Sequence, residues 1–191
     1  ATLVSDKLNF PNLSMVGVDD RAAAYQAVSY LIQQGHRKIA VLGGPATSYP
    51  SMMRRQGAQQ AMEDTGIRFE DKLYGLSNYD FESAYHAMNG LLARRAEFTA
   101  LFAMSDVIAF GAIRALVSAG LRVPEDVSVI GFDGITMSRY CVPVMTTIVQ
   151  PSEQIALQSI ELLVRQIEHG TPAQTVTLRP ELQQGESVRA I

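Results

Sequence analysis

The stretch from Val123 to Gly134 reads VPEDVSVIGFDG and contains a clear strand pattern. Val127, Val129 and Ile130 are β-branched residues in a short, nearly continuous apolar run, which is typical of a strand covered on both faces. In open parallel α/β sheets, ligands bind just beyond the carboxyl ends of the strands. We therefore expect Asp133, at the end of this strand, either to meet a small molecule or to cap a turn or the next helix.

Strand-like and helix-like segments alternate on both sides of this stretch. The expected strands are 14–18, 39–44, 73–76, 99–104, 127–130, 146–149 and 175–178, with a polar edge strand within 181–188. The expected helices are 21–34, 51–65, 81–94, 107–118 and 152–169. This alternation predicts an α/β protein with a doubly wound parallel sheet and right-handed crossovers.

Composition narrows the class of protein. The chain has 191 residues, enough for one core or two small lobes, and it is 47% hydrophobic and 18% charged, as in soluble globular proteins. A formal charge of -3 without a basic cluster argues against direct nucleic-acid binding. The chain shows neither a signal peptide nor an apolar stretch long enough to cross a membrane, so we expect a cytoplasmic location.

Cysteine and histidine give no indication of a metal site. Cys141 is the single cysteine, so the chain has no internal disulfide. His36, His86 and His169 are scattered, and we interpret each as a surface or capping residue. We expect no metal and no cofactor.

Several polar side chains follow the expected strands. Asp20 precedes a helix and is interpreted as an N-cap, a ligand contact or both. Arg54 is expected in the first turn of its helix, where a cation opposes the helix dipole, so its role is not explained by helix stability. A guanidinium there offers a rigid set of donors to carboxylates or hydroxyls. Tyr79 either packs on the core or provides a stacking surface for an apolar ligand face.

Ser105 and Asp106 follow the strand 99–104. We expect Asp106 to cap the next helix rather than to contact a ligand, although both remain open, and we expect Ser105 to face the cleft. Carboxylates, one arginine, one aromatic ring and amides at strand ends suit hydrogen bonding to a polyhydroxylated ligand. They indicate binding without chemistry.

Motifs of catalysis are missing. The sequence GGPATS at 43–48 lacks both the lysine of a phosphate-binding loop and the GxGxxG spacing, and no GxSxG motif occurs. Asp20, Asp106 and Asp133 lie on separate strand ends without a supporting His or Glu pattern. We therefore expect no catalytic residue and do not expect an enzyme.

The segment Met137 to Met145, MSRYCVPVM, is apolar and irregular, with Pro143 inside it. It fits neither a helix nor a central strand. An exposed apolar loop of this kind suggests a subunit contact.

Six motifs taken together resemble the effector-binding core of the lactose-repressor (LacI/GalR) family of bacterial transcription regulators. They are VGVDD (16–20), GHRKIAVLGGP (35–45), RRQG (54–57), MSDVIAFGAIRAL (104–116), GLRVPEDVSVIGFDG (120–134) and MTTIVQP (145–151). The resemblance covers nearly the whole chain from about Leu13 onward.

The resemblance implies a type I periplasmic-binding-protein-like fold with two α/β lobes, three crossings between them, and a small effector, usually a sugar or nucleobase, in the cleft. The positions that match the family's cleft residues are Asp20, Arg54, Tyr79, Ser105, Asp133 and Gln150. Arg54 and Asp133 resemble the pair that binds sugar hydroxyls, and Tyr79 the aromatic residue that stacks on the ring. The family's dimer interface falls on Met137, Tyr140 and Val142.

The sequence departs from the family in two ways. Ser105 stands where the family often has Asn, and the family's helix-turn-helix, hinge helix and first half of the amino-terminal lobe are not in this chain. We expect residues 1–37 and 146–179 to form a partial amino-terminal lobe, and 38–145 and 180–191 a complete carboxyl-terminal lobe.

The resulting hypothesis is the effector-binding and dimerisation part of a regulator. It would form a homodimer, bind a sugar or related effector, contact operator DNA only through a helix-turn-helix absent from this chain, and contact no membrane. The alternatives are a periplasmic sugar-binding protein of an uptake system and a sugar- or nucleotide-processing doubly wound enzyme.

Overall fold

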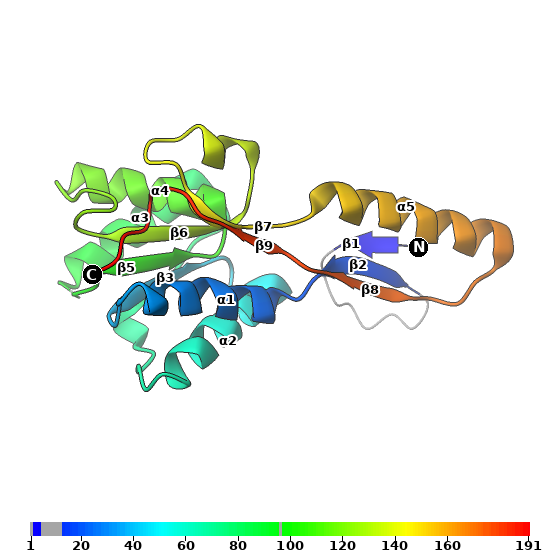
Figure 1. Ribbon diagram of the computed structural model, residues 1–191, viewed down its shortest axis with the longest axis horizontal. Helices are drawn as coiled ribbons and strands as arrows, with labels where there is room; N and C mark the ends of the chain where they lie inside the picture. Colours follow the sequence, from blue (N-terminus) through cyan, green and yellow to red (C-terminus); the bar gives the residue numbers. More distant parts are fainter. Residues whose placement is uncertain (1, 5–12, 96) are drawn as a thin grey trace.

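The computed structural model describes residues 2–4, 13–95 and 97–191, which form two α/β lobes of unequal size along one long axis (Figure 1). The larger lobe contains a six-stranded sheet, and the smaller lobe a three-stranded sheet with one long helix. The alternation of strands and helices expected from the sequence is present in both lobes.

The sheet of the larger lobe is mostly parallel. Its strands are β3 (Ile39–Gly43), β4 (Tyr74–Leu76), β5 (Ala100–Ala103), β6 (Ser128–Asp133), β7 (Thr146–Val149) and β9 (Glu181–Gln183). They lie in the order β4-β3-β5-β6-β7-β9, and only the edge strand β9 is antiparallel to its neighbour. Every residue of β3 and β5 is buried, which explains their uninterrupted apolar sequences.

Helices cover both faces of this sheet. They are α1 (Asp20–Gln33), α2 (Tyr49–Glu63), α3 (Phe81–Ala93) and α4 (Asp106–Ser118), with short 3-10 turns η1 (Asp71–Leu73) and η2 (Thr136–Arg139). Helices α1 and α2 pack together on one face, and α3 and α4 on the other (Figure 1). The larger lobe is therefore doubly wound, as predicted.

The smaller lobe is built from distant parts of the chain. Strands β1 (Thr2–Val4), β2 (Ser14–Val18) and β8 (Thr175–Leu178) form a parallel sheet, and α5 (Ser152–His169) packs against it. The chain passes between the lobes after β2, after β7 and after β8, so the three crossings that the resemblance implied are present.

The lobe boundaries differ from the expected ones. We expected residues 20–37 and 146–149 in the smaller lobe, but α1 packs on α2, and β7 pairs with β6. Gly57 explains the close contact between the helices, because a Cβ there would overlap the backbone oxygen of Arg21. The smaller lobe is consequently reduced to residues before α1 and the segment from α5 to β8.

One local expectation was wrong. His36, expected to be a surface or capping residue, is buried and contacts the hydroxyl of Thr99 through Nδ1 and the backbone oxygen of Arg189 through Nε2. The carboxyl-terminal segment covers this histidine, and a local sequence pattern does not predict a contact between residues so far apart in the chain.

Candidate cleft between the lobes

Two cavities adjoin the junction of the lobes. The first, of about 330 Å³, lies between β2 and β8 of the smaller lobe and the amino-terminal ends of α1 and α2. The second, of about 380 Å³, lies in the larger lobe. Arg54 and Pro50 line both cavities, so the two form neighbouring parts of one candidate site.

The second cavity lies where the strand order reverses. Strand β4 pairs with one edge of β3, and the next strand in the chain, β5, pairs with the other edge. The helices that follow β3 and β5 therefore leave the sheet in opposite directions. Ligands of open α/β sheets bind at such a point, beyond the carboxyl ends of the strands. Arg54 reaches this point and donates through Nη1 to the backbone oxygen of Met104, directly after β5.

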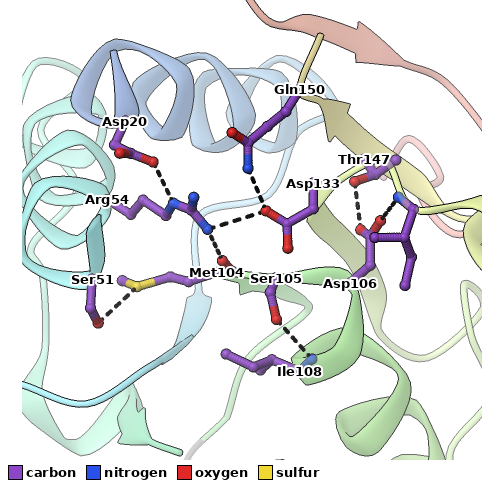
Figure 2. A network of polar contacts seen from close by, with 11 residues as sticks. Asp20, Ser51, Arg54, Met104, Ser105, Asp106, Ile108, Asp133, Thr147 and Gln150 are labelled. Carbon is purple, nitrogen blue, oxygen red and sulfur yellow. Dashed lines mark hydrogen bonds and ion pairs between the residues drawn. The ribbon is translucent and has the colours of Figure 1, made fainter. Parts of the chain in front are cut away.

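Arg54 is the centre of a polar network (Figure 2). Its side chain is buried, with 6% of the residue exposed, and Nε donates to Oδ1 of Asp20 over 2.7 Å. Nη1 lies 3.6 Å from Oδ1 of Asp133, and the guanidinium lies 3.7 Å from the centre of the Phe132 ring. A buried arginine is stable only when its charge is paired, and here two carboxylates from different elements provide the pairing.

Asp133 is held from several sides. Gln150 donates through Nε2 to Oδ1 of Asp133 over 2.7 Å. Burial raises the pKa of Asp133, and the charge of Arg54 and the bond from Gln150 oppose that rise. Its backbone has a φ of 108°, a region that non-glycine residues rarely adopt. The structure thus fixes this carboxylate at the edge of the second cavity in a strained conformation.

Tyr79 lines the second cavity from the loop before α3. Its ring packs directly on Gly44, where a Cβ would overlap it, and its φ is 61°. The hydroxyl is buried and has no hydrogen-bond partner among the residues that the structure describes. The prediction that Tyr79 packs on the core is confirmed, and its ring also borders the cavity, whereas stacking on a ligand stays a prediction.

Ser105, and not Asp106 as expected, caps helix α4. Ser105 is the N-cap of α4, since its hydroxyl accepts from the amide of Ile108 over 3.1 Å. Ser105 still lines the second cavity. Asp106 is the first helical residue and is fully buried, so the prediction that it caps the helix was wrong.

The predicted capping role of Asp20 is taken by its neighbour. Asp19 accepts from the amide of Ala22 over 3.0 Å, and Asp20 instead pairs with Arg54 and lines the first cavity. Arg54 lies in the second turn of α2, not in the first as expected, because that helix begins earlier, at Tyr49.

All six predicted site residues line one of the two cavities. Asp20 and Gln150 line the first, Tyr79, Ser105 and Asp133 the second, and Arg54 both. The sequence did not identify the remaining polar lining residues, which are Asp19, Arg21, Ser48, Tyr49, Thr175 and Thr177. Ser48 could have been predicted as a site residue, because it lies just beyond the end of β3. The threonines of β8 could not, since alternating Thr and apolar residues fit any edge strand.

Within the described residues, no group of His, Cys, Asp and Glu side chains is arranged to hold a metal ion. The helices of this part of the chain are also too short or too polar to cross a membrane. The side chains that line the two cavities are hydrogen-bonding groups, apolar groups and the rings of Tyr49 and Tyr79.

Comparison with known proteins agrees with this geometry. Residues 28–188 match the family model described as a periplasmic binding protein-like domain. The chain is 38% identical over 174 residues to the HTH-type transcriptional regulator MalR of Clostridium butyricum, covering 91% of this chain and 52% of MalR. It is 38% identical over 156 residues to the HTH-type transcriptional repressor CytR of Escherichia coli K12, covering 82% of this chain and 46% of CytR.

A solved structure shows the same fold. The transcriptional regulator CelR in complex with cellobiose superposes with a TM-score of 0.92 at 32% identity, covering 97% of this chain and 58% of that one. The chain spans about half the length of the curated relatives it matches. These relatives are regulators and not uptake proteins. The chain belongs to the periplasmic binding protein-like domain family, as the effector-binding type of domain found in LacI-type transcription regulators.

Proposed function

We propose that this chain binds a small, neutral, polyhydroxylated effector, a sugar or a related molecule, between its two lobes. In the full-length protein, binding would change the orientation of the lobes and so the affinity of a separate helix-turn-helix for operator DNA. Such control is a population shift between two conformations that differ in effector affinity.

The observation that carries this proposal is the buried network of Arg54, Asp20 and Asp133. Asp20 begins α1 at a crossing between the lobes, and Asp133 ends β6. Gln150, which bonds Asp133, lies at a second crossing. A ligand that bonds these side chains contacts the crossings themselves, and so favours one orientation of the lobes over another.

The charges support a neutral ligand. One guanidinium is shared by two carboxylates, and Arg54 also donates to the backbone oxygen of Met104. Carboxylate oxygens accept hydrogen bonds, so they suit the hydroxyl groups of a sugar and repel a phosphate. The ring of Tyr79 lines the second cavity and suits the apolar face of a sugar ring.

We further propose that the protein is a homodimer that acts in the cytoplasm and has no catalytic activity. Met137, Tyr140 and Val142 are exposed by 59%, 77% and 93%, and Val142 borders an apolar groove that includes Ile113 and Val117. Apolar side chains this exposed in a row are typical of an interface. Sedimentation of the full-length protein and of a Tyr140→Glu, Val142→Glu double variant tests it: loss of the dimer in the variant is expected, and an unchanged dimer contradicts the assignment.

The ligand is tested by thermal unfolding of the full-length protein against cellobiose, ribose, their phosphates, nucleosides and purines. A ligand at about 100 times its dissociation constant stabilises the folded state by about 2.7 kcal/mol. We expect a rise in Tm with a neutral sugar, and its loss in Asp133→Ala.

Asp126→Ala is the matched control. It removes a carboxylate that bonds Arg122 on the exposed surface, away from both cavities. A response that survives in Asp133→Ala, or that is lost equally in Asp126→Ala, contradicts the site. A response only to phosphorylated sugars contradicts the proposed ligand class.

A further inference from the structure

The carboxylate of Asp106 lies at the base of the loop that joins β6 to β7. Its Oδ2 accepts from the backbone amide of Ile135 over 2.8 Å, at the start of the loop, and its Oδ1 accepts from the hydroxyl of Thr147 over 2.6 Å, just after its end. Figure 2 shows both bonds, with Asp106 on the side of the network away from Arg54. One side chain of α4 therefore fastens both ends of this loop.

The surrounding sheet leaves space for this carboxylate. Asp106 is fully buried, and Gly131 of β6 lies beside it, where a Cβ would overlap Oδ1 of Asp106. The φ of Gly131 does not lie in the left-handed region, so its lack of a side chain is required by space and not by backbone conformation.

The bond to Ile135 also restrains Asp133. Asp133 and Gly134 both have positive φ values, 108° and 70°. On one side of this strained pair, the backbone oxygen of Asp133 accepts from the amide of Gln150 over 3.0 Å. On the other side, the amide of Ile135 is held by Asp106. Strained conformations persist only when such surrounding bonds fix them.

We propose that Asp106 is a positioning residue for the effector site: by holding Ile135 and Thr147, it keeps the Asp133 carboxylate directed at Arg54 and joins the site rigidly to the loop 134–145. That Asp133 then binds an effector rests on the proposed function; that Asp106 fixes its position does not.

The charged neighbours of Asp106 make its titration a useful readout. Burial raises its pKa to about 6, the bonds from Thr147 and Ile135 oppose this rise, and the charge of Asp133 adds to it. From the loop, Cys141 also faces it, since Asp106 helps to raise the pKa of that thiol. Opening of the loop exposes Asp106 to water and returns its pKa toward the ordinary value, so opening becomes easier as pH rises through about 6.

The test is amide hydrogen exchange of the full-length protein, measured without ligand and corrected for the intrinsic rate at each pH. In Asp106→Ala, an unpaired amide at Ile135 should raise exchange in peptides covering 133–137 and 147–151 by roughly tenfold, with β3 and β5 unchanged. Asp106→Asn keeps an acceptor for Ile135 and should preserve wild-type protection at pH 7. It should also lose the fall in protection between pH 5 and 7 that the wild type shows.

Gly131→Ala is a second, independent variant, because it retains Asp106 and displaces its carboxylate. It should reproduce the local effect of Asp106→Ala. Ser187→Ala is the structural control: its buried hydroxyl donates to the backbone oxygen of Val129 and accepts from the backbone amide of Thr146, near the amino-terminal ends of β6 and β7. It should leave 133–137 unchanged relative to the rest of the lobe.

Unchanged exchange at 133–137 in both Asp106→Ala and Gly131→Ala overturns the inference. So does an equal increase in all strands of the sheet, since this indicates only a loss of global stability. Affinity for cellobiose in the same variants separates the two proposals. Local exchange that rises while no sugar binds even the wild type supports the positioning role and contradicts the proposed effector.

Discussion

The two lobes have the same alternation of strand and helix but very different cores. In the larger lobe, one continuous cluster of buried apolar side chains extends through the sheet and its four helices. In the described part of the smaller lobe, the buried apolar cluster is Val16, Ile155 and Leu162. Sequence pattern is therefore enough to form each element, whereas a core requires elements on both faces of a sheet.

Helix α5 buries only part of its apolar surface. Ile155 and Leu162 are buried against the small sheet, but Leu157, Ile160 and Ile167 of the same helix are exposed by 60% or more. Strand β8 alternates between exposed and half-buried residues and contains no buried one. Among the described residues, the apolar surface of α5 is wider than the part that packs against the small sheet.

The first prediction compares the two cores. Leu101→Ala in β5 should lower the free energy of unfolding by about 4 kcal/mol, because it leaves a cavity between two covered faces. Leu162→Ala in α5 should cost about 2 kcal/mol or less and affect exchange only in the smaller lobe. Urea unfolding followed by circular dichroism measures both, and equal costs would show that the smaller core is as well packed as the larger.

The second prediction concerns the network between the cores. Arg54→Ala should lower the free energy of unfolding by about 3 kcal/mol, because it leaves Asp20 and Asp133 without their buried counter-charge. The neighbouring Arg55→Ala is the control. Arg55 is more exposed, lies 3.6 Å from the exposed Asp71 and 4.5 Å from the centre of the Tyr74 ring, so we expect a loss of about 1 kcal/mol. Similar losses in both variants would contradict the buried-pair interpretation.

The third prediction concerns how the free energy of unfolding depends on pH through Asp106 in the larger lobe. The pKa of Asp106 is raised from 3.8 to about 6 on folding, so the folded state binds this proton more tightly than the unfolded state. Stability contributed by the protonated group is thus present near pH 4 and is lost as pH rises to about 6, by at most ~3 kcal/mol.

Asp106→Asn removes this titration and keeps the shape of the side chain. Its free energy of unfolding, minus that of the wild type, should increase from pH 4 to 6 and then remain constant. Asp133, whose pKa burial also raises, is present in both proteins and cancels from the difference. A difference that does not vary with pH would show that Asp106 is not buried as a charge.

Most element positions were predictable from the sequence. The strands 14–18, 146–149 and 175–178 and the helix 152–169 have the expected bounds, and the other expected elements differ by a few residues at their ends. Apolar periodicity and terminating glycines explain this success, since both act over a few residues. The predicted cleft residues do line two adjoining cavities, because the carboxyl ends of parallel strands meet at one edge of the sheet.

Local sequence pattern predicts the alternation of elements, the buried character of β3 and β5, and the polar residues at the strand ends. Three contacts depend instead on how the chain folds: Asp20 pairs with Arg54, His36 is covered by the chain's carboxyl-terminal segment, and Asp106 faces the base of a loop. These contacts join residues far apart in the chain. A local pattern reports which residues share a face of an element, whereas the partner across that face depends on how the elements pack.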